Sequence, residues 1–216
     1  MSRRLAPDVR RAEIIDTTMR LIAEDGPHGL SLRSVARRCE MSAPGLMHHF
    51  PTLRDLLRAV VEERARIGRE AIAEIVREAG DGLTLQMLAD ALIRFYYTDK
   101  AAETRNFDAL EAESLAPGHP AHGIYPRSAI QPLPITRRLA ERDFEDPDAA
   151  LTMLSLLADA LRSRWLRDLE PVDRWNEWVA SRDHVFGTLE RRHKHELPAP
   201  DTTSDTSHPD NLSPDR

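Results

Sequence analysis

The 216-residue sequence is poor in cysteine, in glycine and in long hydrophobic runs. Its one cysteine, Cys39, cannot form a disulfide within the chain, which favours a reducing compartment such as the cytoplasm. No run approaches the roughly 18 apolar residues of a membrane-spanning helix. No apolar segment follows the first arginines, as one would in a signal peptide. We therefore expect a soluble cytoplasmic protein.

Charge is unevenly distributed along an acidic chain. Residues 1–60 contain 10 Lys and Arg against 7 Asp and Glu, a net charge of +3, whereas the remainder carries −9 and the whole chain −6. A basic N-terminal segment on an acidic body suits a small module that faces phosphate groups. Ordinary solvated surfaces would give a similar count, so charge alone leaves both interpretations open.

The hydrophobic pattern predicts an all-α protein, because apolar residues recur at helical spacing and strand-like alternation is scarce. Serine and threonine mark several helix starts, whereas five prolines interrupt residues 115–134. The last residues are rich in Pro, Ser, Thr and Asp and lack aromatics, which predicts disorder. The expected helices cover residues 7–25, 31–38, 42–48, 53–79, 84–99, 101–115, 135–142, 146–166 and 171–192. We divide the chain into an N-terminal domain of residues 1–52, a helical domain of residues 53–195 and a disordered tail of residues 196–216.

The spacing from Ser31 to Phe50 is that of a helix-turn-helix, in which two short helices cross over a small residue, Ala36. The second helix would enter the major groove of DNA with its N-terminal residues nearest the base edges. Gly45 would let a phosphate or a base approach the backbone, and hydroxyls and free amides at helix starts can bind phosphates. Each residue taken singly fits a helix cap or a solvated side chain equally well. The residues expected at DNA are Ser31, Arg33, Arg37, Ser42, Ala43, Pro44, Gly45, Met47, His48, His49, Thr52 and Arg54.

Residues 10–60 resemble the N-terminal DNA-binding domain of TetR-family transcriptional regulators. The resemblance implies a helix-turn-helix domain followed by a helical domain that binds a ligand and forms a dimer. It also implies that the regulated genes are often neighbours of the regulator's own gene. The residues that carry it are Ile14-Ile15-Asp16, Glu24-Asp25-Gly26, Ser31-Leu32-x-x-Val35-Ala36, Ser42 to Pro51 and Asp55-Leu56-Leu57.

Several positions depart from the family pattern. The turn is Cys39-Glu40-Met41 where the family usually has alanine-glycine-valine, so a left-handed glutamate would cost roughly 1 kcal/mol unless the turn is built differently. Met47 stands where an aromatic residue is common, and Leu53 stands where a lysine is common, with Arg54 one residue later. These departures concern individual DNA contacts and leave the fold prediction unchanged.

A second group of candidates lies in the predicted body. Three consecutive aromatics cannot all face one core, so some of them would line a pocket for a small, mainly apolar effector. The fifth to eighth helices and residues 115–134 would bound this pocket. A plain core position explains each aromatic as well. The two histidines of this group lack the carboxylate or thiolate partners of a zinc site, and no catalytic motif appears, so we expect no metal, no cofactor and no enzyme. The candidates are Phe95, Tyr96, Tyr97, Phe107, His119 and His122.

Apolar stripes on the last two predicted helices suggest a dimer. Two such helices from each chain would close a four-helix bundle around a two-fold axis, although the stripes could instead pack inside their own chain. We therefore predict a ligand-responsive repressor that binds a near-palindromic operator as a homodimer. The alternatives are a constitutive or architectural DNA-binding protein, and an enzyme that uses His119 and His122. The expected interface residues are Leu154, Leu157, Leu161, Trp165, Trp175, Trp178 and Phe186.

Overall fold

The computed structural model describes residues 6–125, 133–168 and 173–192, and every element named in these ranges is helical. The predicted all-α fold is confirmed. A 3-10 turn, η1 (Gly80–Gly82), and a π-helical turn, η2 (Phe95–Asp99), flank α5. None of the described helices is both long enough and apolar enough to cross a membrane. The helices are α1 (Pro7–Asp25), α2 (Leu32–Arg38), α3 (Ala43–His49), α4 (Leu53–Ala79), α5 (Leu85–Arg94), α6 (Ala101–Glu113), α7 (Pro134–Asp143), α8 (Pro147–Arg167) and α9 (Arg174–Gly187).

The first four helices begin and end within one residue of the predicted positions. Side-chain oxygens cap their starts: Ser31 accepts a hydrogen bond from the amide of Ser34 at 3.1 Å, and Thr52 accepts one from the amide of Asp55 at 3.1 Å. These bonds satisfy amides that have no partner within the helix. Gly80, at the end of α4, has φ +57°, a conformation that glycine adopts without strain.

The later boundaries correct two predictions. The helix predicted over residues 84–99 changes to a π-helical turn at Phe95, and the helix predicted over 171–192 runs only from Arg174 to Gly187. The Asp173 carboxylate caps α9 by accepting from the amide of Asn176 at 3.0 Å, which fixes the start three residues later than expected. Residues 171 and 172 and the predicted tail, residues 196–216, lie outside the described residues.

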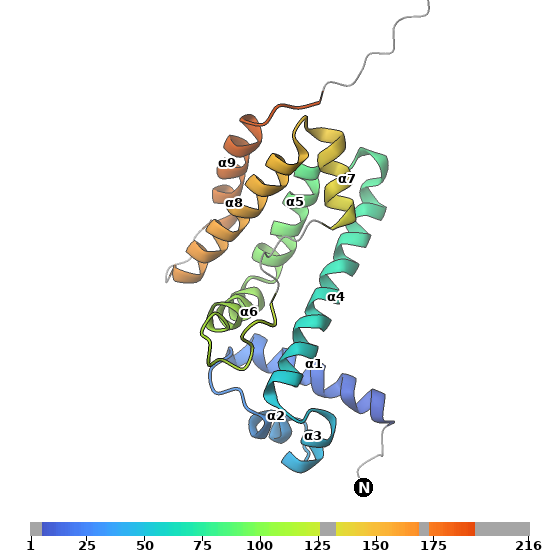
Figure 1. Ribbon diagram of the computed structural model, residues 1–216, viewed down its shortest axis with the longest axis vertical. Helices are drawn as coiled ribbons and strands as arrows, with labels where there is room; N and C mark the ends of the chain where they lie inside the picture. Colours follow the sequence, from blue (N-terminus) through green and yellow to red (C-terminus); the bar gives the residue numbers. More distant parts are fainter. Residues whose placement is uncertain (1–5, 126–132, 169–172, 193–216) are drawn as a thin grey trace, which may run out of the picture.

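The buried side chains form two clusters at opposite ends of the molecule (Figure 1). The N-terminal cluster joins α1 to α4, and it also takes in Phe107 and Leu110 of α6 and Ala121 of the following segment. The amide nitrogen of Asn106 on α6 donates to the carbonyl of Ala23 on α1 at 2.8 Å. The N-terminal helices are therefore packed directly against α6. The predicted domain boundary near residue 52 stays a prediction.

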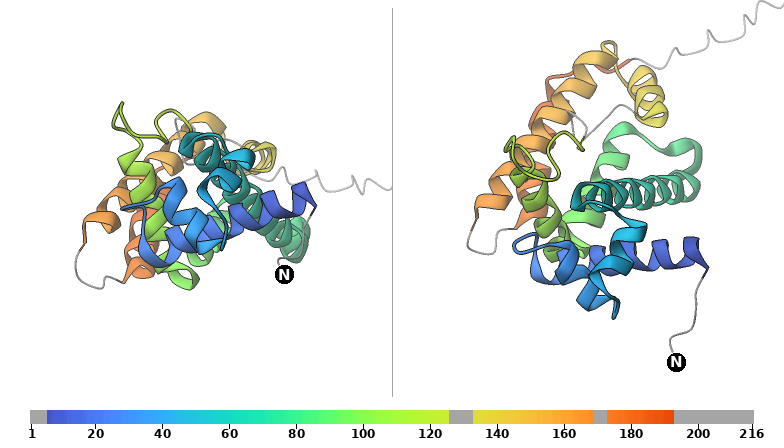
Figure 2. Two further views of the ribbon diagram at one scale, coloured as in Figure 1. Left: turned by 90° about the horizontal axis from the view of Figure 1, so that it is seen from below. Right: turned by 60° about the horizontal axis from the view of Figure 1, so that its bottom comes forward.

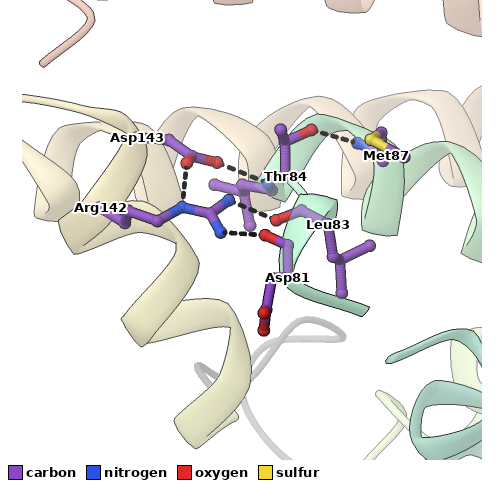
Figure 3. A network of polar contacts seen from close by, with 7 residues as sticks. Asp81, Leu83, Thr84, Met87, Arg142 and Asp143 are labelled. Atoms are coloured by element: carbon purple, nitrogen blue, oxygen red, sulfur yellow. Dashed lines mark hydrogen bonds and ion pairs between the residues drawn. The ribbon is translucent and has the colours of Figure 1, made fainter. Parts of the chain in front are cut away.

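The second cluster is formed by α5, α7, α8 and α9, which lie beside the far half of α4 (Figures 1 and 2). A polar network holds its outer end, where α7 meets the turn between α4 and α5 (Figure 3). The Asp143 carboxylate accepts from the amide of Leu85 at 2.8 Å and from the Arg142 guanidinium at 2.8 Å. Arg142 also donates to the carbonyls of Asp81, at 3.3 Å, and Leu83. These bonds satisfy backbone groups that helix ends leave without partners.

Candidate nucleic-acid interface

Helix α3 buries one face and exposes the other. Leu46 and Phe50 are fully buried in the N-terminal cluster, whereas Pro44, Met47 and His48 are exposed. Positions 44, 47 and 48 have the i, i+3, i+4 spacing of neighbours on one helical face. The short helix thus presents a continuous surface to solvent at the end of the molecule, as a DNA recognition helix requires.

The turn between α2 and α3 takes the first of the two forms left open by the sequence, with a left-handed glutamate. Glu40 has φ +51° and is the one non-glycine residue with positive φ in the part of the chain that the structure describes. The amide of Met41 donates to the carbonyl of Ala36 at 3.0 Å, which closes the turn. Ala36 is buried and its small side chain lets the two helices approach closely. Burial raises the pKa of the neighbouring Cys39 thiol, so this cysteine is poorly suited to redox sensing.

Arg11 of α1 fastens the end of α3. Its guanidinium donates to the carbonyl of His49 at 2.8 Å and lies over the Phe50 ring, 4.0 Å from the ring centroid. Sequence reasoning missed this residue, because the contact joins positions 38 residues apart and leaves no local pattern. Arg11 therefore positions α3 by holding its C-terminal end against α1.

The three arginines predicted at DNA have different surroundings. Arg33 and Arg37 are exposed on α2 and make no hydrogen bond or ion pair with the described residues. Arg54 instead donates to two carbonyls of the segment after α6, that of Pro120 at 3.2 Å and that of His122 at 2.7 Å. Arg33 and Arg37 are thus available for phosphate, whereas the Arg54 guanidinium is already engaged and its DNA contact stays a prediction.

The hydroxyl residues predicted at DNA act as N-terminal caps of their helices. The hydroxyl of Ser42 accepts from the amide of Gly45 at 3.2 Å, and a Cβ added at Gly45 would lie 3.0 Å from that oxygen. The glycine therefore gives room to the cap of its own helix, while the backbone approach to DNA remains a prediction. Ser31 and Thr52 are also occupied as caps, and Ala43 and His49 are only partly exposed.

Residues 14–60 match the family model described as "Bacterial regulatory proteins, tetR family". The N-terminal domain is therefore that of the TetR family. A curated relative, the HTH-type transcriptional regulator BetI of Klebsiella pneumoniae (strain 342), is 30% identical over 108 residues. The match spans 50% of this chain and about half the length of that relative. The predicted resemblance to TetR-family regulators is confirmed for the N-terminal part of the chain.

Solved structures show the same fold over most of the chain. A proposed TetR-family regulator from Rhodococcus sp. has a TM-score of 0.55 at 20% identity, covering 82% of this chain and 98% of the other. The multidrug binding protein EbrR, solved with imidazole, has a TM-score of 0.55 at 21% identity, covering 85% of this chain and 97% of the other. At these identities the likeness concerns the fold alone.

The predicted effector residues do not line one pocket. Phe107 is buried in the N-terminal cluster, with the Arg64 guanidinium 4.1 Å from its ring centroid. The rings of Phe95 and Tyr96 pack edge to face at 4.9 Å, and the Tyr97 ring packs on Trp165 at 4.8 Å. The aromatics of this segment are therefore divided between separate packing partners.

The two histidines lie at two different hollows. His122 lines a cavity of about 480 Å³ between α6, α8 and the segment after α6. His119 lines a separate hollow of about 440 Å³ near the turn that follows α1, where its ring nitrogen lies 3.7 Å from the Glu113 carboxylate. None of the four predicted aromatics lines either hollow, so the apolar pocket expected from them stays a prediction, although one cavity does lie between two of the expected helices.

Most of the predicted dimer residues are buried in their own chain. Leu154, Leu161, Trp165, Trp178 and Phe186 have exposed fractions between 0 and 6% and belong to the second cluster. The indole nitrogens are satisfied there too, since Trp165 donates to Glu177 at 2.7 Å and Trp178 donates to Asp90 at 2.7 Å. The rival account, packing within one chain, holds for these five.

Some apolar side chains of α8 and α9 remain on the surface. Leu157 and Trp175 are partly buried against the second cluster, so they keep some surface for a partner. Leu156 and Met153 on α8 are 64% and 44% exposed. Both exposed residues lie outside the seven expected interface residues.

Proposed function

We propose that this regulator binds a near-palindromic operator as a homodimer and represses transcription until a small effector weakens that binding. The observation that carries the DNA-binding part is the exposed face of α3, formed by Pro44, Met47 and His48 on a helix whose other face is buried. Arg33 and Arg37 on the preceding helix supply free positive charge beside it. Phosphate contacts would fix the register, and the α3 side chains would contact base edges.

The homodimer would use the outer face of α8. Leu156 and Met153 are exposed there, and Ala160 lies one turn further along the same side. A small residue next to larger apolar ones on the same face would let two helices cross closely about a two-fold axis. Two recognition helices are needed because half-sites on B-DNA lie about 34 Å apart and each reads only a few base pairs.

The effector response is supported by the cavity between α6 and α8, whose walls are continuous with helices that pack on the DNA-binding region. A constitutive or architectural DNA-binding protein would have no use for such a cavity. We propose no catalytic role, and we place the protein in the cytoplasm, where the operator is accessible.

Sequence selection from random duplex DNA, followed by a mobility-shift assay, tests the recognition helix. Met47→Ala and His48→Ala should relax the preference at single base pairs and cost about 1–3 kcal/mol of operator affinity. The matched control is Met87→Ala on α5, because Met87 and Met47 are equally exposed, at 48%. Unchanged base preference in both α3 variants would refute the assignment of α3.

A further inference from the structure

The cavity between α6 and α8 has a mixed lining. Its walls come from the last two turns of α6, the second half of α8 and the segment of residues 114–125, and its volume is about 480 Å³. Ala112, Leu115 and Leu166 contribute apolar surface, and the Tyr125 ring adds an aromatic wall. A volume of this size suits a small organic molecule.

The charged residues of the lining are mainly acidic. Asp108, Glu111 and Asp159 supply three carboxylates, against the single guanidinium of Arg162. Arg162 lies 3.1 Å from Glu111 and 3.9 Å from Asp108, so its charge is already shared between them. Asp159 makes no hydrogen bond or ion pair with any described residue. The lining therefore keeps an excess of negative charge, with one carboxylate left over.

A hydroxyl group inside the site also lacks a partner. The Tyr125 oxygen is buried, and among the described residues nothing accepts or donates a hydrogen bond to it. A buried hydroxyl without a partner is costly, and a bound molecule with a polar group would satisfy it. Beside it, the Tyr97 hydroxyl donates to the Asp108 carboxylate at 3.1 Å, which holds that carboxylate in place.

The same cavity adjoins the DNA-binding region. His122 lines it, and the His122 carbonyl accepts the 2.7 Å hydrogen bond from Arg54 at the start of α4. The preceding residue, Ala121, is fully buried in the N-terminal cluster. A molecule that displaces this segment would therefore disturb the contacts that hold the first turn of α4, directly after α3.

We propose that this cavity is the effector site and that the effector is a small organic cation, an amine or quaternary ammonium with an apolar body. The inference rests on the proposed function and adds the chemical class of its effector. The charged head lies against the carboxylates of Asp159 and Glu111, and the apolar body lies against Leu115 and Leu166. An anion would meet three carboxylates and a guanidinium that is already paired, so the cavity discriminates by charge.

Three probes of similar shape and different charge test the class: benzyltrimethylammonium, benzyl alcohol and benzoate. Calorimetric titration of the full chain should give binding of the cation that is at least about tenfold tighter than that of either other probe. Asp159→Asn should weaken cation binding about tenfold, because it removes the unpaired carboxylate and keeps the side-chain shape. The control is Glu62→Gln, an exposed carboxylate on α4 outside the cavity.

Each outcome is decisive. Equal binding of benzoate or benzyl alcohol, no binding of the cation, or unchanged affinity in Asp159→Asn would overturn the inference. A mobility-shift assay on the same preparation tests DNA binding separately, so that failure of the effector class and failure of the proposed function can be distinguished. Selected operator bound without any cation binding would overturn the effector class alone. Cation binding without binding to any DNA would overturn the proposed function and leave the cavity assignment in place.

Discussion

The positioning role of Arg11 makes a prediction that separates it from a DNA contact. Arg11→Leu removes the hydrogen bond to the His49 carbonyl and the guanidinium stacking on Phe50. A typical hydrogen bond contributes roughly 0.5–1.5 kcal/mol and an exposed cation–π contact roughly 0.5–1 kcal/mol. We therefore expect the variant to lose about 1–2 kcal/mol of unfolding free energy.

The loss should extend to DNA affinity without changing its salt dependence. A loosened α3 docks less well, which we expect to lower operator affinity about 5- to 30-fold. The slope of log affinity against log salt should stay the same, since no phosphate contact disappears. Arg33→Leu is the matched control, because Arg33 is exposed and has no partner among the described residues. That variant should lower the slope by about 1 and leave thermal stability unchanged.

The measurement is a fluorescence-anisotropy titration of labelled operator at several salt concentrations, with thermal unfolding followed by circular dichroism. The two variants should differ in a defined way. Arg11→Leu should lower stability and keep the salt slope, whereas Arg33→Leu should keep stability and lower the salt slope. If Arg11→Leu lowered the salt slope and unfolded at the wild-type temperature, Arg11 would be a phosphate contact and the reasoning above would be refuted.

Two further predictions concern the body. Burial raises the pKa of Asp108 to about 6, against the opposing influence of Arg162, so the folded state holds this proton more tightly than the unfolded state. The resulting stability is complete below about pH 4 and is lost as pH rises through about 6, a change of at most about 3 kcal/mol. Urea unfolding should show this dependence in the wild type, and Asp108→Asn should lack it; parallel pH profiles would contradict the assignment. Separately, Leu156→Glu should yield helical monomers by light scattering, whereas Met87→Glu should stay dimeric, and a wild-type monomer at micromolar concentration would refute the dimer.

The sequence predicted the N-terminal helices well because local interactions set their ends. Ser31 and Thr52 bond to amides three residues away, so their caps can be recognised from sequence spacing alone. For the turn at Glu40 the sequence left open a left-handed glutamate or a different turn, and the residue has φ +51°. Two later helices were predicted less accurately. The apolar periodicity continues through the Asp173 cap and through the π-helical turn after α5, so it marks neither boundary.

The sites in the body could not be predicted in the same way, because periodicity reports that a side chain is buried without reporting what buries it. The stripe containing Leu161 and Trp178 fits a dimer interface or an internal core equally well, and the described structure assigns it to the core. Phe107 looked like a pocket residue beside the other aromatics, yet it packs under Arg64, a contact across 43 positions. The cavity itself depends on Asp108 and Arg162, which no sequence motif connects.

Helix α6 contacts both ends of the molecule and would couple them. One side of it is fixed to the DNA-binding region, where Leu110 is buried in the N-terminal cluster and Asn106 bonds to the end of α1. Its other side carries Asp108 and Glu111 into the cavity. A molecule bound in the cavity can shift α6 from one position to another only if it binds the protein more tightly when α6 is in the second position. Because α1 packs on α6 and Arg11 of α1 holds the end of α3, a shift of α6 would reach the recognition helix through direct contacts.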